Sequence, residues 1–473
     1  MAMFLKPKKT SHFAVAATLK RNHSAMVPTV KSGSRANNSL WAESPSEITP
    51  QTSEFINSAD VAIIGGGFSG LWSAFHLKRL EPSLSIAIFE AQELGFGASG
   101  RNGGWASSDY PVYRPTLVKR HGRESTDLLF DSLNSSIDEI GDFARQYAPA
   151  CGFVKSGTIS FARNLGQSKR LQALIDEDHQ WLRAEEVSER LKVTGVLGGI
   201  FNPKCATVQP FELLAGLARY LDSIGVKIYT NTFASEVPGG VLANNHFVDA
   251  PRVIRATEVF GKPGRDFIPL YSLMVATEPL GEDIWREIGA QERFTFAEAS
   301  HLINYAQRTV DNRLAIGGRG ATYPLGSKLL ESKEQTPRVH ENLRSLARSW
   351  FPVLNDVKFT HSWGGAVAIT RDWEPYVLWN KETGRARLGG YAGDGVTMSY
   401  LAANTLAHEI LEIESRFRKL HFVNRPIRKW EPEPLRYLAI NSLVKLSDIA
   451  DAEERMTQRP SFLSRIIEPL ILR

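Results

Sequence analysis

The chain has 473 residues, of which 42% are hydrophobic and 23% charged, proportions that are ordinary for a soluble globular protein. Its length favours more than one domain, and no uninterrupted apolar stretch of about 18 residues predicts a membrane-spanning helix. The formal net charge of +5 comes from the N-terminal segment, where seven basic and no acidic residues precede Glu43, so we expect no nucleic-acid binding by the folded part.

Residues 1–57 are predicted to form a disordered basic arm, because they contain four prolines and no periodic apolar pattern. A basic, acid-free start with serines is also typical of transit peptides, so targeting to an organelle stays open. The two cysteines, Cys151 and Cys205, form no CxxC pair and predict neither a disulfide framework nor a metal site. We therefore expect a reducing compartment and a cytoplasmic location.

A strand–helix–strand unit opens the folded part, with a buried strand at 60–64, a helix at 69–80 and a second strand at 85–89. Between the first strand and the helix, residues 65–70 satisfy GxGxxG. In this pattern Gly65 permits a tight turn, Gly67 lets a pyrophosphate approach, and Gly70 lets helix and strand pack closely. The first helical turn, with Phe68 and Ser69, would then hold the anion.

Glu90 ends the second strand, 20 residues after Gly70. A carboxylate at this position accepts hydrogen bonds from ribose hydroxyls and repels a 2′-phosphate. The pattern therefore predicts a dinucleotide with a free 2′-hydroxyl, which leaves FAD and NAD as candidates.

A second run of small residues, Ser99-Gly100-Arg101-Asn102-Gly103-Gly104-Trp105, follows nine residues after Glu90. Such a run lets the backbone lie against a flat, bulky group, and Arg101 offers charged, forked donors to it. A third glycine-rich turn, 390–397, precedes a predicted helix at 398–412.

The other elements are predicted from apolar periodicity and turn residues. We expect helices at 125–147, within 168–193 and at 211–224, and strands at 155–162, 206–209, 226–230 and 384–390. A hairpin over 237–254 should turn near Asn244-Asn245. Strands at 272–277, 302–307 and 313–317 predict an antiparallel sheet.

The unit 60–70, Glu90 and the run 97–104 together resemble the D-amino-acid oxidase/glycine oxidase superfamily, and most of all its γ-glutamylputrescine oxidoreductase branch. The resemblance extends over roughly 39–459 and implies FAD. In the family, the turn that 390–397 matches brings backbone amides to the pyrimidine edge of the flavin. Asp394 stands where many relatives have His, while the glycines are kept.

The resemblance also implies which residues contact FAD, including the backbone of Val237 at the adenine. It implies non-covalent binding, because no cysteine or histidine occupies the positions at which some relatives tether the flavin. The expected FAD contacts are Gly65, Gly67, Phe68, Ser69, Gly70, Glu90, Ala91, Ser99, Gly100, Arg101, Asn102, Gly103, Gly104, Val237, Gly393, Gly395, Val396 and Thr397.

The expected fold class is α/β, with a Rossmann-like FAD-binding domain and an interleaved antiparallel-sheet substrate domain. The FAD-binding domain is expected in three parts, 58–110, 206–260 and 363–420. The substrate domain is expected in two parts, 111–205 and 261–362, and 421–473 is expected as a C-terminal extension.

The expected reaction is oxidation of a C–N bond in a small amine or amino-acid-like substrate, by hydride transfer to flavin N5 and hydrolysis of the imine. Because the flavin carries the chemistry, no protein base is assigned. Trp105, Trp363, Arg371 and Tyr391 are candidates to line the substrate site; the alternative for the aromatics is core packing, and for Arg371 an ion pair with Asp372 or Glu374. Electrons could pass to oxygen, or to a quinone or carrier protein, and a non-catalytic flavin-binding scaffold is the third hypothesis.

Overall fold

The computed structural model describes residues 38–43, 54–261, 264–464 and 467, all within a compact unit over Asn37–Arg473. Most of the expected arm therefore lies outside the described residues. Its described stretch 38–43 does not fit the expectation of disorder, because Leu40–Glu43 form the 3-10 helix η1 and Trp41 is buried. The Trp41 indole donates to the carbonyl of Asn102, 2.8 Å away, and so anchors this stretch to the body.

A six-stranded sheet carries the predicted nucleotide-binding layer, in the order β18-β19-β12-β1-β2-β8. All neighbours are parallel except β18, which runs antiparallel at the edge. Every residue of β1 is buried, as the apolar run predicts. The strands are β1 (Val61–Ile64), β2 (Ile86–Phe89), β8 (Lys227–Tyr229), β12 (Arg252–Arg255), β18 (Tyr376–Asn380) and β19 (Arg385–Gly389).

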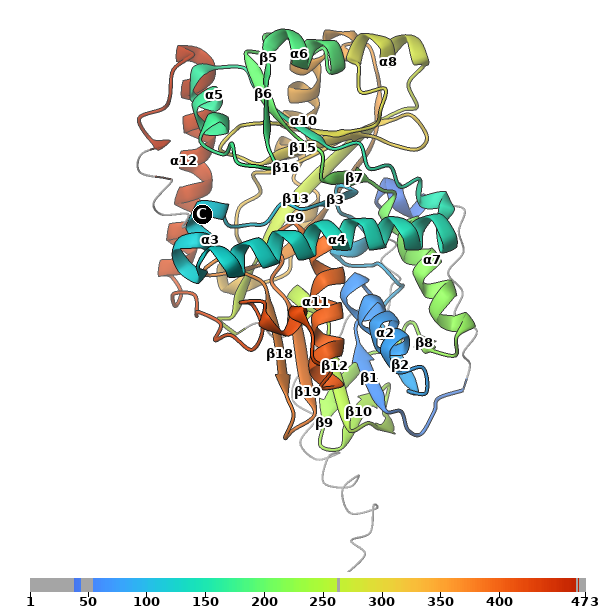
Figure 1. Ribbon diagram of the computed structural model, residues 1–473. Helices are drawn as coiled ribbons and strands as arrows, with labels where there is room; N and C mark the ends of the chain where they lie inside the picture. Colours follow the sequence, from blue (N-terminus) through green and yellow to red (C-terminus); the bar gives the residue numbers. More distant parts are fainter. Residues whose placement is uncertain (1–37, 44–53, 262–263, 465–466, 468–473) are drawn as a thin grey trace, which may run out of the picture. The chain divides into compact units, whose positions relative to one another are not determined.

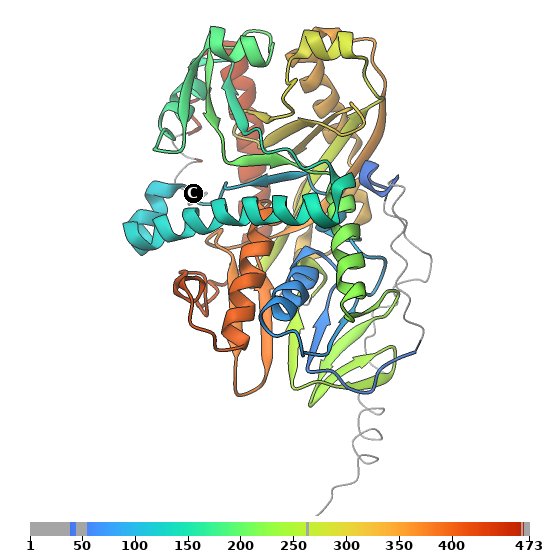
Figure 2. The same ribbon diagram turned by 45° about the vertical axis from the view of Figure 1, so that its right-hand side comes forward.

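Helices α2 (Phe68–Leu80) and α11 (Gly395–Ile410) pack side by side on one face of this sheet (Figure 1). Helix α4 (Arg123–Tyr147) lies across α11 and α7 (Pro210–Ser223), as both ribbon views show (Figure 2). The predicted helices at 69–80, 125–147, 211–224 and 398–412 are confirmed with small shifts at their ends. Helices α2 and α11 therefore lie next to each other on the same face of the sheet.

A three-stranded antiparallel sheet, β9 (Ala234–Val237), β10 (Gly240–Ala243) and β11 (His246–Asp249), covers the other face. The predicted turn is confirmed at Asn244 and Asn245, whose φ angles are 43° and 71°. Two consecutive positive φ angles are the geometry that asparagine tolerates in a tight hairpin.

The second large sheet has eight strands in the order β17-β13-β16-β15-β14-β4-β6-β5. All its neighbours are antiparallel except β14 and β4, so the predicted antiparallel layer is confirmed. The expected domain boundary at 363 falls inside β17. The strands are β4 (Thr158–Ala162), β5 (Gln180–Arg183), β6 (Gly198–Asn202), β13 (Phe267–Thr277), β14 (Thr295–Glu298), β15 (Asn304–Arg308), β16 (Leu314–Arg319) and β17 (Phe359–Thr370).

The expectation of helix within 168–193 is confirmed by two helices, α5 (Leu165–Gln172) and α6 (Ala184–Arg190), which β5 separates. The Asp176 carboxylate accepts from the backbone N–H of Asp178 and contacts the ring of His179. Such local side-chain hydrogen bonds compete with a helix. The remaining elements are β3 (Trp105–Ser107), β7 (Cys205–Thr207), α3 (Arg114–His121), α8 (Glu282–Ile288), α9 (Glu331–Glu334) and α10 (Pro337–Trp350).

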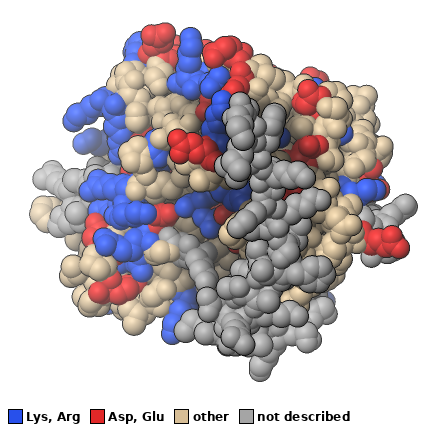
Figure 3. Space-filling model, turned by 90° about the horizontal axis from the view of Figure 1, so that it is seen from below, with Lys and Arg blue, Asp and Glu red and all other residues tan. Residues whose placement is uncertain are grey.

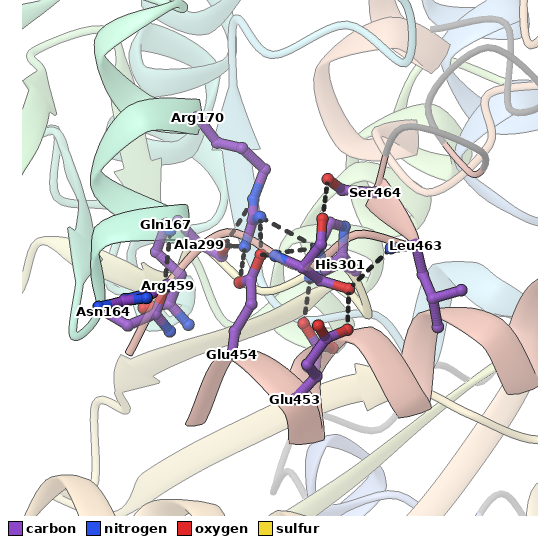
Figure 4. A network of polar contacts seen from close by, with 12 residues as sticks. Asn164, Gln167, Arg170, Ala299, His301, Glu453, Glu454, Arg459, Leu463 and Ser464 are labelled. Carbon is purple, nitrogen blue, oxygen red and sulfur yellow. Dashed lines mark hydrogen bonds and ion pairs between the residues drawn. The ribbon is translucent and has the colours of Figure 1, made fainter. Parts of the chain in front are cut away.

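A long C-terminal helix, α12 (Leu435–Thr457), packs along the second sheet (Figure 1). A polar network holds it there: Glu454 lies within 2.7 and 2.8 Å of the two terminal nitrogens of Arg170, and within 3.2 Å of the ring of His301 (Figure 4). Asp451 accepts the backbone N–H groups of His301 and Leu302. The helix is therefore attached largely by charged groups.

Two surface properties complete the description. No described helix is long and apolar enough to cross a membrane. On the face seen from below, basic and acidic side chains are interspersed wherever grey atoms leave it visible (Figure 3). The visible part of this face therefore carries no continuous basic patch.

Candidate functional site

The first glycine loop joins β1 to α2 with the close packing that the motif predicts. Gly65 has a φ of 113°, and a Cβ on Gly70 would lie 2.0 Å from the carbonyl oxygen of Gly65. Helix α2 begins without a side-chain cap on its N-cap residue, Gly67. The loop therefore offers a helix N-terminus whose N-cap residue carries no side chain, which suits an anion.

Glu90 lies at the end of β2 and contacts this loop directly. Its carboxylate accepts the N–H of Gly66 at 2.7 Å and the N–H of Gln92 at 2.9 Å. Burial raises the pKa of Glu90 above its usual value, against the opposing effect of these hydrogen bonds. Glu90 therefore lies directly beside the glycine loop, and its contact with a ribose stays a prediction.

The second glycine cluster lies against the first. Ser99 Oγ accepts the backbone N–H of Phe68 at 2.9 Å, which ties the cluster to the start of α2. The amide side chain of Asn102 closes the turn by accepting the N–H of Gly104 at 2.8 Å. A Cβ on Gly104 would lie 2.4 Å from the carbonyl of Val208, so only glycine fits this turn, whose φ is 70°.

Arg101 is buried at the centre of this cluster. Its guanidinium pairs with the carboxylate of Glu334 at 2.9 Å and lies over the ring of Phe96, 4.7 Å from the ring centroid. Its Nε has no hydrogen-bond partner among the described residues. Arg101 therefore keeps a buried donor available at the site.

The third glycine-rich turn leads into α11. Ala392 and Gly393 have φ angles of 53° and 118°, and α11 begins with no side-chain cap from Asp394. The hydroxyl of Tyr391 lies 2.8 Å from Ser69 Oγ, so this turn meets the first turn of α2. The three predicted segments are therefore brought together from the two ends of the chain.

Glu258 contacts the backbone at the start of this turn. Its carboxylate accepts the N–H groups of Gly390 at 2.8 Å and Ala368 at 3.1 Å. Burial raises its pKa to about 7. Its link to this turn could not be read from the spacing of residues in the sequence.

A cavity of about 850 Å³ opens where these segments face the second sheet. The glycine-rich segments contribute Arg101, Gly103, Gly393 and Val396 to its lining, while the second sheet contributes Tyr305. The first glycine loop is not among its described lining residues. Other lining residues are Asn102, Trp105, Asp109, Tyr110, Thr158, Asn202, Asn304, Arg319, Gly365, Val367 and Asp394.

The donors around this space fit the cofactor that the motifs predict. Two helix N-termini that receive no cap from the side chain of their own N-cap residue, those of α2 and α11, would face the diphosphate and the ring of FAD respectively. Besides Arg101 Nε, Trp105 Nε1 and Thr397 Oγ1 are buried without a hydrogen-bond partner in the described part of the chain. Buried donors of this kind are normally satisfied, so a polar group bound here would pair them.

The four substrate-site candidates lie in different places. Trp105 lines the cavity. Trp363 is fully buried behind it and donates to the carbonyl of Arg101 at 3.0 Å. Tyr391 turns toward Ser69, as described above. Only Trp105 thus has the expected position, and roles for the other two aromatic residues stay predictions.

Arg371 lies outside the cavity lining and pairs with Glu431 at 2.9 Å. The expected alternatives, Asp372 and Glu374, are wrong as partners because Asp372 pairs with Arg425 and Glu374 with Arg120. The ion-pair interpretation of Arg371 holds with a different carboxylate.

Val237 ends β9, where its carbonyl accepts a hydrogen bond from Arg385 at 2.9 Å, and its contact with adenine stays a prediction. Sequence reasoning missed several lining residues: Asp109 and Tyr110 follow β3 in a segment without a motif, and Tyr305 is one residue of an alternating strand. Arg319 ends β16 and lies between Gly318 and Gly320, and these glycines are the one signal that the sequence offers for it.

Comparisons with known proteins agree with this geometry. A family model described as DAO, FAD dependent oxidoreductase, matches residues 60–409. The chain is 26% identical over 389 residues to the γ-glutamylputrescine oxidoreductase of Escherichia coli (strain K12), with 78% of this chain and 87% of that protein covered. It is 22% identical over 410 residues to the sarcosine oxidase subunit beta of Arthrobacter sp, with 77% and 93% covered.

The fold agrees with a solved structure as well. The crystal structure of glycine oxidase from Geobacillus kaustophilus aligns with a TM-score of 0.67 at 20% sequence identity. The alignment covers 79% of this chain and 100% of that chain, so both sheets are shared architecture.

Proposed function

This chain belongs to the DAO family of FAD-dependent oxidoreductases, and on that premise we propose that it oxidises a carbon–nitrogen bond of a small amine or amino-acid-like substrate. FAD is its cofactor, bound without a covalent link as is normal in the family. The relatives named above act on a putrescine derivative or carry the names of sarcosine and glycine oxidases. The substrates in these names share an amine nitrogen next to a carbon that can be oxidised.

The observation that carries the proposal is the cavity between the two sheets. It borders the flavin-side segments through Arg101 and Gly393, and the second sheet through Tyr305. Its lining contains both a carboxylate, Asp109, and a guanidinium, Arg319. A substrate with an ammonium group and a carboxylate or amide would find a partner for each end.

Bound FAD supplies a two-electron acceptor, which takes a hydride from the carbon next to nitrogen and leaves an imine for water to hydrolyse. The start of α11 would stabilise negative charge at the edge of the ring that it faces. Trp105 and Tyr305, whose ring centroids lie 6.1 Å apart at 74°, form an aromatic corner that would hold the substrate and exclude water.

The electron acceptor is a separate question. Oxygen, or a quinone or carrier protein, would each accept the electrons from the reduced flavin. The residues that line the cavity favour neither kind of acceptor. A flavin-binding scaffold without turnover is a weaker alternative, because a cavity beside the predicted flavin turn has no role in it.

An anaerobic bleaching screen tests the proposal. The purified yellow protein is mixed with γ-glutamylputrescine, sarcosine, glycine and a wider panel of amines, and loss of flavin absorbance is followed. We expect at least one amine to bleach the flavin and to yield a carbonyl product. A flavin that stays oxidised throughout would support the scaffold. Hydrogen peroxide production in air, compared with anaerobic turnover with a dye, then identifies the acceptor.

A further inference from the structure

A chain of four side chains leads from the cavity toward the surface. Tyr110 lines the cavity, and its hydroxyl lies 3.2 Å from Nε2 of His421. The same His421 nitrogen lies 3.2 Å from Oε2 of Glu374. Nε2 of His121 lies 2.9 Å from this one oxygen. Two imidazoles therefore share a single carboxylate oxygen, and one of them also contacts a cavity phenol.

The solvent exposure of these side chains rises toward the end of the series, at His121. The side chains of His421 and Glu374 are 5% and 4% exposed, whereas that of His121 is 25% exposed. Nδ1 of His421 has no partner among the described residues, so its hydrogen bonding is concentrated at Nε2. That atom contacts the hydroxyl of Tyr110, a cavity residue, on one side and the carboxylate of Glu374 on the other.

The geometry points to a proton relay that carries the proton of a substrate ammonium from the cavity to solvent through Tyr110, His421, Glu374 and His121. This inference rests on the proposed amine oxidation, since only a neutral amine gives up a hydride readily from its neighbouring carbon. The relay would remove the proton that must leave a water-excluding site before that step.

The transfer is balanced at every atom. At rest both imidazoles carry their single proton on Nδ1, so each Nε2 can accept a proton. Tyr110 Oη takes the ammonium proton while it gives its own proton to Nε2 of His421. The resulting imidazolium passes this Nε2 proton to Oε2 of Glu374, and this oxygen passes it to Nε2 of His121, which releases the same proton to water. No oxidation state changes, and each group returns to its initial state once His121 has lost the Nε2 proton.

The ionisation states at rest suit this order. Burial raises the pKa of Tyr110 well above its usual value, so the phenol keeps its proton between transfers. Burial lowers the pKa of His121, as does the neighbouring His421, so His121 is neutral at neutral pH and can accept. Burial opposes ionisation of Glu374, but hydrogen bonds from His421 and Arg120 hold its pKa at about 2.

A metal ion explains the cluster less well. The ligand atoms of His121, Glu374 and His421 lie within 4.8 Å of one another. The two rings, however, are stacked, with centroids 4.1 Å apart and planes 12° from parallel. An imidazole binds a metal along its lone pair, in the plane of the ring, and one ion cannot lie in two parallel planes. A hydrogen-bonded proton tolerates this arrangement.

Chemical rescue of stopped-flow flavin reduction tests the relay. The FAD-loaded enzyme is mixed anaerobically with an amine that bleaches the wild type, and the variants His121→Ala and Tyr110→Phe are compared. We expect each variant to reduce flavin about tenfold more slowly. Imidazole should restore the rate of His121→Ala, because a small base can replace the group at the solvent end. Pyrazole, which has the same shape but is far less basic, should not.

Imidazole should not restore the rate of flavin reduction in Tyr110→Phe, because this substitution interrupts the relay at the cavity and not at its solvent end. His361, whose ring pairs with Glu43 away from the cavity, provides the control His361→Ala, which should be as fast as the wild type with and without imidazole. Unchanged rates in both variants would overturn the relay. So would equal rescue by pyrazole, or stoichiometric zinc in the purified protein. If no amine bleaches the wild type, the proposed function fails first and the relay falls with it.

Discussion

The hydroxyl oxygens of Ser69 and Tyr391 lie 2.8 Å apart, although 322 residues separate them in the chain. Ser69 belongs to the first turn of α2 and Tyr391 to the turn before α11. This hydrogen bond joins the first turn of α2 to the predicted flavin turn. The two segments predicted to bind the dinucleotide are therefore in direct contact.

The hydroxyls of Ser69 and Tyr391 should contribute to stability as one hydrogen bond. Tyr391→Phe removes only the hydroxyl and should cost about 1 kcal/mol of stability, as a single buried hydrogen bond does. Ser69→Ala should cost a similar amount. In a double-mutant cycle on the melting temperature of the FAD-loaded protein, the second substitution should add little to the first. Fully additive losses would show that the two hydroxyls act independently.

The close packing of the first glycine loop predicts a specific sensitivity. Gly70→Ala places a Cβ where the carbonyl oxygen of Gly65 is 2.0 Å away, so the loop must move. We expect FAD affinity, measured by titrating the apoprotein, to fall at least about tenfold, which corresponds to about 1.4 kcal/mol. Gly195→Ala is the control for FAD affinity, because Gly195 has open space beside it, although its φ of 72°, unlike that of Gly70, is positive.

The two arginines singled out in the sequence should differ in effect. Arg101 is buried at the cavity and paired with Glu334, whereas Arg371 pairs with Glu431 outside the lining. Arg101→Met should reduce FAD affinity or the rate of flavin reduction at least about tenfold, because it removes a charged hydrogen-bond donor at the cavity together with the ion pair to Glu334. Arg371→Met should stay within about twofold of the wild type, as expected for a partly exposed ion pair. The reverse ranking would contradict the assigned positions.

The attachment of α12 should depend on pH. Burial raises the pKa of Glu454, but hydrogen bonds from Arg170 and His301 outweigh it and hold the pKa at about 2, below the ordinary 4.5. Because the folded-state pKa is depressed, the stabilisation is complete above about pH 4.5 and is lost as the pH falls toward about 2.

Glu454→Gln should therefore destabilise the protein by on the order of 3 kcal/mol at neutral pH. The difference from the wild type in thermal melts should shrink as the pH falls through that window. Asp448→Asn is the matched control, since Asp448 lies on the same helix in an exposed pair with Arg338 and should change stability little. A difference that stays constant with pH would contradict the role of Glu454.

The parts of the fold that sequence predicted well are those in which neighbouring residues decide the structure. The β1–α2–β2 unit follows from an apolar run, a glycine loop and helical spacing. The hairpin at Asn244 and Asn245 follows from two residues that tolerate positive φ. In the site, the glycine segments were found for the same reason, since close backbone approach leaves a mark in the sequence.

Helix α12 shows why other elements were missed. Its buried positions include Arg436, Asp451 and Glu454, while Leu435 and Leu438 are 60% and 58% exposed. The apolar pattern is therefore reversed relative to the surface that the helix covers, and hydrophobic periodicity could not reveal it. The cluster of Tyr110, His121, Glu374 and His421 was missed because its members meet only in the folded chain.

Release of the cofactor by acid tests the central claim, that FAD is held without a covalent bond by segments from the two ends of the chain. The purified protein, incubated with FAD and freed of excess, is precipitated with acid, and flavin is measured in the supernatant and the pellet. We expect a yellow protein before precipitation and close to one FAD per chain in the supernatant. A protein that stays colourless after incubation, or flavin that remains in the pellet, would contradict the claim.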